Sequence, residues 1–272
     1  MAQTSRARSE RSRSPACAFG FGVPIGTLGG LIGLGGAEFR LPVLTGVLGY
    51  RARQAVAVNL AVSLITVTAA AIIRGGTLDW QPVVELLPIA IAMTTGAVLA
   101  AYVAIGFVHR LPETGLRRLI LVLLVAIGVA LIVEAFVTHD GGGLLDRRGV
   151  LPLLVAVACG LAIGTVSSLL GVAGGELIIP TLLFIFGTDI ITAGTVSLLV
   201  SLPTVGVGVG RHARRGTYAD RVDWTATIVP MGIGSIIGAV IGGLLVGIAP
   251  DDLLKIILGI ILIVSAARVF RH

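Results

Sequence analysis

The stretch that decides the fold occurs twice: Gly29–Pro42 reads GGLIGLGGAEFRLP, and Ser167–Pro180 reads SSLLGVAGGELIIP. Each copy is apolar, is interrupted by a cluster of glycines, and continues with a glutamate and a proline. A shift of 138 positions aligns Ile25–Val67 with Ile163–Val205 without a gap and gives 18 identities in 43 pairs. Apolar composition alone does not explain glutamates and prolines at matched positions. The chain therefore contains an internal duplication.

The composition indicates a membrane protein. Of the 272 residues, 56% are hydrophobic and 12% are charged, and the mean hydropathy is +1.03. A soluble domain has about 45–50% apolar and about 25% charged residues. Apolar runs of roughly 20 residues recur along the chain, as in helices that cross a bilayer. We therefore predict an all-α polytopic membrane protein rather than a soluble helical protein with a very large core.

The charged and metal-binding residue types exclude several classes of function. The net charge of +6 does not indicate nucleic-acid binding, because the basic residues cluster in short loops and tails, as the positive-inside rule expects. Cys17 and Cys159 show no metal-ligand spacing and no disulfide framework. The four histidines lie in loops or at segment ends, which argues against a haem or metal site within the membrane. We expect no cofactor, no metal ion and no catalytic residue.

The duplication divides the chain into four parts. Residues 1–15 form a basic tail that we expect to be disordered and cytoplasmic; a signal peptide is the competing interpretation, but no cleavage site follows a bounded apolar run. Residues 16–137 form the first transmembrane repeat, 138–150 the connector and 151–272 the second repeat. Each repeat contains four apolar segments, so we predict two homologous halves, which form an inverted repeat if the opening segment of each half folds back instead of crossing the membrane.

Each half opens with a helix that glycine interrupts. The 33 residues of Cys17–Gly49 would reach about 50 Å as one helix, which is too long for one span and short for two. We therefore expect two half-helices that meet at Gly33–Gly36, and the same in the second half. Non-helical backbone at membrane depth occurs only where protein or a water-filled cavity surrounds it. Interrupted segments at matching positions of two halves are typical of a transporter's binding site.

The remaining segments are predicted from their apolar lengths and their turn residues. A helix over Ala52–Ile73 carries Asn59, Ser63 and Thr66 on one face, because they are four and three residues apart. Trp80 and Trp224 lie in loops and are expected at the two membrane interfaces. The further expected helices are Val83–Phe107, Leu116–Val137, Thr225–Ile248 and Leu253–Phe270; in Thr225–Ile248, the four-residue spacing of Gly234, Gly238 and Gly242 indicates close helix packing.

Charge placement bears on whether the broken helix crosses the membrane or re-enters. If it crosses, inner loops hold nine Lys or Arg residues and outer loops six, without the tail. If it folds back as a re-entrant hairpin, the counts are eleven and four, the outer ones being Arg74, Arg147, Arg148 and Lys255. The positive-inside rule favours the hairpin, which also places the halves in opposite orientations.

The layout resembles the sulfite exporter TauE/SafE family, also called the TSUP family. The doubled motif carries the resemblance, as Gly33-Leu-Gly-Gly before Pro42 and Gly171-Val-Ala-Gly-Gly before Pro180, together with the Gly-Thr…Asp-Trp loops. The resemblance runs from about residue 18 to the end. It implies a multi-pass protein of the bacterial inner membrane that carries small sulfur anions such as sulfite or sulfoacetate. Glu38 and Glu176 depart from it, because the family more usually has apolar residues there.

The glycine turns are the first candidate binding residues. Half-helix N-termini present free N–H groups and a positive dipole end, which suit a small anion; the alternative is that the glycines only permit tight packing. Hydroxyl and amide groups nearby could donate to an oxyanion, or could bond between helices. The candidate substrate-binding residues are Gly33, Gly35, Gly36, Arg40, Asn59, Ser63, Thr66, Gly171, Gly174, Gly175, Ser197, Ser201 and Thr204.

Three charged residues within the broken helices raise further hypotheses. An ionisable residue inside a membrane segment is by default a functional candidate. Burial disfavours a charged carboxyl, so Glu38 and Glu176 could exchange a proton during transport; alternatively each caps its second half-helix. Arg40 corresponds to Ile178, so the halves differ chemically. It binds the anion or pairs with a carboxylate of another segment.

These observations predict a secondary transporter, an exporter, that moves a small sulfur-containing anion through a site near the midplane, with proton coupling. No G-x-x-x-x-G-K-[ST] motif occurs, so ATP hydrolysis by that route is not expected. An anion channel that uses the glycine turns as a filter is the alternative, followed by a membrane-embedded enzyme or assembly factor. The expected partners are the anion and the lipid bilayer; the sequence does not indicate an oligomeric state.

Overall fold

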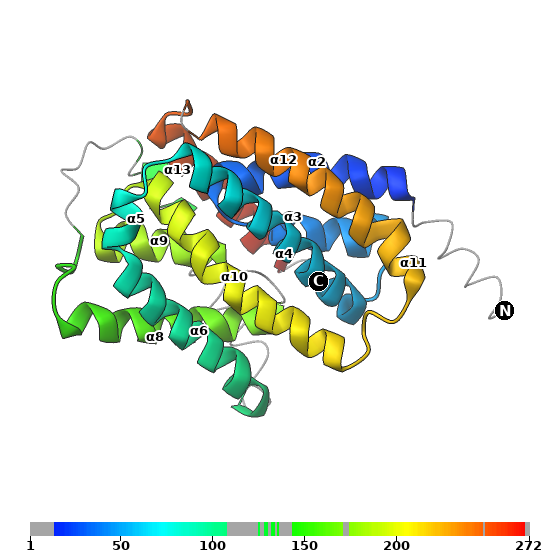
Figure 1. Cartoon of the computed structure of the whole chain (residues 1–272), viewed down its shortest axis with the longest axis horizontal. Helices are drawn as coiled ribbons and strands as arrows, with labels where there is room; N and C mark the ends of the chain where they lie inside the picture. Colours follow the sequence, from blue (N-terminus) through cyan, green and yellow to red (C-terminus); the bar gives the residue numbers. More distant parts are fainter. Residues whose placement is uncertain are drawn as a thin grey trace.

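The computed structural model describes residues 14–107, 125, 128–129, 132–133, 135, 143–170, 174–246 and 248–269. All regular elements within these ranges are helices, as predicted (Figure 1). Five of them are long and apolar enough to cross a membrane: Pro15–Ile32, Gln54–Thr77, Val150–Ser167, Ile190–Arg214 and Arg221–Leu245. The predicted helix Leu116–Val137 and all but the last two residues of the tail lie outside the part described in full.

The first broken helix consists of α2 (Pro15–Ile32), α3 (Ala37–Pro42) and the π-helical turn η1 (Val43–Val47). The break falls at the predicted glycines. Gly33, Gly35 and Gly36 have φ angles of 92°, 78° and 71°, a left-handed conformation that residues with a Cβ rarely adopt. The prediction of two half-helices meeting at this point is therefore confirmed.

The chain folds back at the first glycine turn. Ala18, near the start of α2, lies in one buried cluster with Leu44 of η1 and with Leu48 and Tyr50, which follow η1. Because the end of η1 returns to the level at which α2 begins, α2 and α3–η1 form a hairpin. We call Pro15–Val47 the first hairpin.

The second broken helix folds back in the same way. It consists of α8 (Val150–Leu170) and α9 (Gly175–Phe186), with Gly174 at a φ of 82°. The end of α9 lies beside the connector that precedes α8, because the Leu145 N–H donates to the Ile185 carbonyl at 3.0 Å. We call Val150–Phe186 the second hairpin. Gly171 lies outside the described residues.

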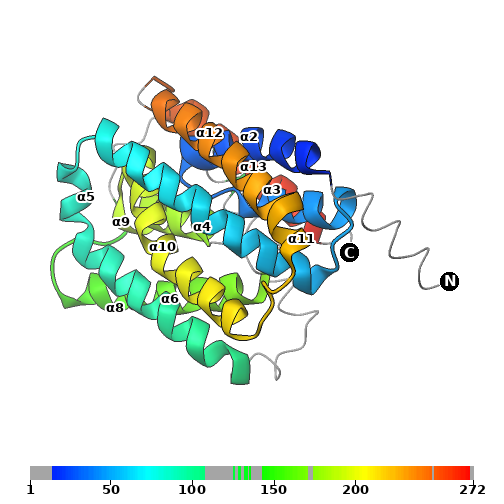
Figure 2. The same ribbon diagram turned by 45° about the vertical axis from the view of Figure 1, so that its right-hand side comes forward.

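Two long helices run through the middle of the bundle (Figures 1 and 2). They are α4 (Ala52–Thr77) and α10 (Ile190–Arg214), and they are more buried than the other candidate spans. Leu60 of α4 packs with Val205 of α10, whereas the end of α4 reaches the start of α10. The two helices are therefore antiparallel. The other elements are α5 (Gln81–Glu85), α6 (Leu87–Phe107), α11 (Arg221–Asp223), η3 (Trp224–Ile228), α12 (Val229–Leu245) and α13 (Asp251–Val269).

Among the differences from the predicted bounds, one moves a charged residue into a helix and one divides a helix. The helix expected over Ala52–Ile73 continues to Thr77, so Arg74 lies inside α4 and is buried, not in an outer loop. The segment expected over Val83–Phe107 is divided at Leu86 into α5 and α6. Pro88 accounts for this division, because it has no N–H for a helical bond and its ring clashes with the carbonyl four residues earlier.

Each hairpin packs on the third helix of the other half. In both views α2 lies along α12 and α6 lies along α8. The contacting residues are themselves related by the shift of 138, so the duplication extends into α6 and α12. The matched contacts are Gly22 with Met231 and Gly160 with Met93, and Gly26 with Ser235 and Gly164 with Ala97.

The glycines of α12 form the predicted packing face. A Cβ at Gly234, Gly238 or Gly242 would meet the backbone of α2. At Gly238 it would lie 2.5 Å from the Thr27 nitrogen and 2.8 Å from the Gly26 carbonyl carbon. The two backbones are thus in direct contact, which only glycine permits at this distance.

We expect Gly238→Ala to lower the thermal unfolding temperature in detergent, because the methyl group would force α12 away from α2. Overpacking of this kind costs about 1–3 kcal/mol. Gly20→Ala, also on α2, is the matched control: a Cβ there would meet nothing within 4 Å, so its unfolding temperature should stay the same or rise slightly. Equal effects of the two substitutions would contradict the close helix contact.

Candidate functional site

The two glycine turns meet in the interior of the protein. A Cβ at Gly33 would lie 2.6 Å from the Gly194 Cα of α10. A Cβ at Gly175, the first residue of α9, would lie 3.1 Å from the Leu34 Cα and 3.2 Å from the Leu34 carbonyl oxygen. The first turn is therefore packed against the start of α9 and against α10, so the two interrupted segments of the duplication share one place.

Arg40 fills the polar face of α4. Its side chain is 0% exposed. Its Nη1 donates to Asn59 Oδ1 at 3.2 Å and to Ser63 Oγ at 2.8 Å, and its Nη2 donates to Thr66 Oγ1 at 3.1 Å. Nη2 also donates to the Gly35 carbonyl at 3.2 Å. The three predicted residues thus lie on one face, and here they accept hydrogen bonds from an arginine between the helices.

The corresponding face of α10 lacks such an arginine. Ile178 takes the position of Arg40, and Ser197, Ser201 and Thr204 are buried on α10. Thr204 Oγ1 donates to the Val200 carbonyl within its own helix at 2.8 Å. Ser197 is fully buried, and its Oγ has no hydrogen-bond partner among the described residues. The two pseudo-equivalent faces therefore differ in how they are satisfied.

Glu38 and Glu176 are both buried in the first turn of the helix that follows the glycines. Each side chain is 7% exposed. Both carboxylate oxygens of Glu38, and Oε1 of Glu176, lack a hydrogen bond to another residue in the described part of the chain. A buried carboxylate without hydrogen bonds is costly when it is charged. The charged form of each carboxyl group is therefore less favourable here than it would be in water.

Arg74 is the buried residue that the sequence prediction missed. Its Nε donates to the Gly30 carbonyl at 3.1 Å and its Nη2 to the Leu31 carbonyl at 2.8 Å, both in the last turn of α2. Its Nη1 donates to Thr195 Oγ1 of α10 at 3.0 Å. The last carbonyls of a helix have no partner within it, and Arg74 supplies partners for two of them.

A signal for Arg74 was present in the sequence. It follows Asn59, Ser63 and Thr66 on the same helical face, because Thr66 and Arg74 are eight residues apart and Ala70 lies between them at the four-residue step. The prediction ended the helix at Ile73 on apolar content and so moved Arg74 to the membrane surface. A charged residue that continues a polar stripe belongs to the buried face.

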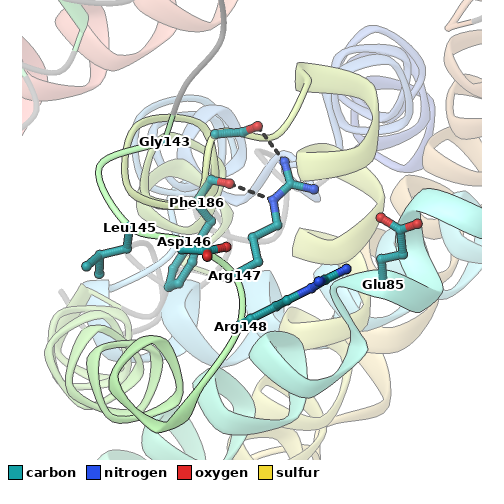
Figure 3. Close-up of a pocket in the computed structure, with 8 residues that line it drawn as sticks. Glu85, Gly143, Leu145, Asp146, Arg147, Arg148 and Phe186 are labelled. Carbon is teal, nitrogen blue, oxygen red and sulfur yellow. Dashed lines mark hydrogen bonds between the residues drawn. The ribbon is translucent and has the colours of Figure 1, made fainter.

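A separate cavity of about 760 Å³ lies at the end of the second hairpin (Figure 3). The connector residues Asp146, Arg147 and Arg148 line it together with Glu85 of α5. Arg147 Nε donates to the Phe186 carbonyl at 2.8 Å at the end of α9, and the Arg148 side chain extends toward Glu85. None of the predicted site residues lines this cavity.

We expect Arg74→Leu to lower the unfolding temperature strongly, since two helix-end carbonyls would lose their partners in the interior. Each unsatisfied buried group costs about 1–3 kcal/mol. Arg148→Leu is the control: Arg148 is exposed, so its replacement should change the stability by less than about 0.5 kcal/mol. A folded Arg74→Leu protein of unchanged stability in detergent would show that the arginine does not hold the end of α2.

The comparisons with known proteins agree with this architecture. The chain matches the family model described as Sulfite exporter TauE/SafE over residues 1–131 and 156–272, which include both hairpins except for the start of the second. Neither the search of curated proteins nor the search of solved structures gave a match. With nearly its whole length matched, the chain belongs to the sulfite exporter TauE/SafE family of multi-pass membrane transporters, which are not enzymes.

Proposed function

We propose that this protein is a secondary transporter that exports a small sulfur-containing anion, such as sulfite or a sulfonate, across the bacterial inner membrane. The observation that carries the proposal is the meeting of the two glycine turns in the interior, at Leu34 and Gly175, next in sequence to buried carboxylates. Interrupted helices that meet at membrane depth are how many secondary transporters build a substrate site. The description of the family supports a sulfur anion.

The same proposal includes an inverted repeat of two re-entrant hairpins. Each hairpin leads at its open end into α4 or α10, and these helices are antiparallel, which supports hairpins that open to opposite sides of the membrane. The exchanged contacts between α2 and α12 and between α8 and α6 support a pseudo-two-fold relation. With Arg74 buried, the outer side keeps Arg147, Arg148 and Lys255 against eleven inner charges, which favours a cytoplasmic N-terminal tail.

Proton coupling through Glu38 and Glu176 is the second part of the proposal. An anion that enters next to two charged carboxylates would be repelled, whereas a proton taken up with it removes one negative charge. Both oxygens of Glu38 and Oε1 of Glu176 accept no hydrogen bond from another residue in the described part of the chain, which supports such a change of charge, because no donor of a neighbouring residue holds these oxygens in the ionised form. Anion and proton would then cross together.

The packing of the turns favours a carrier over a channel. The first turn touches α10 backbone to backbone at Gly33 and Gly194. A channel filter of glycine carbonyls would need an open path between the turns. A carrier instead opens the site to one side at a time by moving one half relative to the other.

We expect purified protein in proteoliposomes to move sulfite, sulfoacetate or thiosulfate with saturation, and the rate to respond to an imposed pH gradient. The double substitution Glu38→Gln/Glu176→Gln should keep the flux and lose its response to the gradient, because an amide keeps the shape of the carboxyl but does not titrate.

Two outcomes would contradict separate parts of the proposal. If the wild type and the double variant respond alike to the pH gradient, the glutamates act as helix caps and not as coupling groups. If the wild type moves none of the three anions, the proposed substrate class is wrong. Flux that rises without saturation would support a channel.

A further inference from the structure

The two halves satisfy their central polar faces in different ways. On α4, the Arg40 guanidinium donates to Asn59, Ser63 and Thr66. In the second half, the position of Arg40 belongs to Ile178 of α9, whose side chain has no donor. Ser197, which corresponds to Asn59 under the shift of 138, keeps a buried hydroxyl with no partner among the described residues.

The unpartnered hydroxyl is costly and therefore informative. Burial of a hydroxyl without a hydrogen bond costs free energy, and nearly all buried polar groups of native proteins have a partner. Alanine at position 197 would avoid this cost at almost the same volume. A serine whose hydroxyl has no partner within the described protein is accounted for when a ligand supplies the partner.

The Ser197 hydroxyl lies directly beside the glycine turn of the second half. Ser197 Oγ lies 3.0 Å from the point where a Cβ of Gly175 would be. Gly175 lies between two candidates, because Gly174 precedes it and Glu176, with its unpartnered Oε1, follows it. The second half thus brings together the unpartnered hydroxyl of Ser197 on α10 and, in the first turn of α9, Gly175 and the buried carboxyl group of Glu176.

We propose that the transported oxyanion binds to the α10 face, where the Ser197 hydroxyl donates a hydrogen bond to one of its oxygens, and that the α4 face is structural. The proposal deepens the proposed function and rests on it, because it names which half binds the anion. Ser63 and Thr66 already accept hydrogen bonds from Arg40, and Thr66 Oγ1 donates to the Val62 carbonyl. Arg40 Nε has no partner among the described residues, but Nη1 and Nη2 are bonded to the side chains of the α4 face, which therefore has an internal cation in the place of a ligand.

The test compares Ser197→Ala with Ser63→Ala, using sulfite flux in proteoliposomes and thermal unfolding in detergent. Ser197→Ala should raise the KM for sulfite about tenfold or more, because the loss of one hydrogen bond to a charged group weakens binding by about that factor. Its unfolding temperature should stay the same or rise. Ser63→Ala should lower the unfolding temperature, because a buried Arg40 N–H loses its acceptor, and should leave KM within about twofold. Ser197→Thr retains the hydroxyl and should keep the KM near that of the wild type.

The pattern of the two substitutions decides the proposal. An unchanged KM in Ser197→Ala overturns it. An equal rise of KM in both variants also overturns it, because the two faces would then be equivalent.

A second measurement does not depend on the identity of the substrate. In a Cys17→Ala/Cys159→Ala background, Ser197→Cys should react with a sulfonate-bearing methanethiosulfonate reagent added in water, and Ser63→Cys should not. Absence of labelling at position 197 overturns the proposal even if sulfite is transported. Labelling at 197 in a protein that moves none of the three anions supports an aqueous site on α10 and rejects only the proposed substrate class.

Discussion

A helix that ends inside a membrane protein leaves carbonyl groups that neither lipid nor the helix itself can satisfy. In this protein Arg74 solves that problem for α2, because its guanidinium donates to the Gly30 and Leu31 carbonyls. Arg40 does the same for the turn, through the Gly35 carbonyl. Arg74 extends from α4 to the end of α2, and Arg40 extends from α3 to α4. Both arginines therefore attach the first hairpin to α4.

These two cations determine the electrostatics of the interior. Both guanidinium groups bond to neutral oxygens, and the hydrogen-bond acceptors of Arg40 and Arg74 do not include Glu38 or Glu176 among the described residues. A buried ion pair with direct hydrogen bonds would fix the carboxylates in the charged form. Without such a bond, Arg40 acts on Glu38 through space, and proton uptake by Glu38 breaks no hydrogen bond to another described residue.

The sequence predicted those features that depend on local chemistry. The glycines predicted a break between two half-helices, and the spacing of Asn59, Ser63 and Thr66 placed them on one face; both predictions are confirmed. Features that depend on tertiary contacts were harder. The partner of Arg40 lies on another helix. The charge counts for crossing and re-entry differed by two residues, so the fold-back follows only from tertiary contacts, such as the packing of Ala18 with Leu44 in the first hairpin.

The difference between the halves has a physical consequence for an anion. A duplicated protein begins with two equivalent polar faces, and one small anion bound in either of them would have two competing positions. Arg40 makes the two faces different, because the α4 face is bonded to its guanidinium, whereas the Ser197 hydroxyl of the α10 face has no partner among the described residues. The Arg40 hydrogen bonds point toward α4. The positive charge of Arg40 still attracts an anion on the α10 face, because Coulomb interactions are weakly screened in a low-dielectric interior. An anion on the α10 face would therefore receive directional hydrogen bonds from the second half and attraction from a cation that belongs to the first.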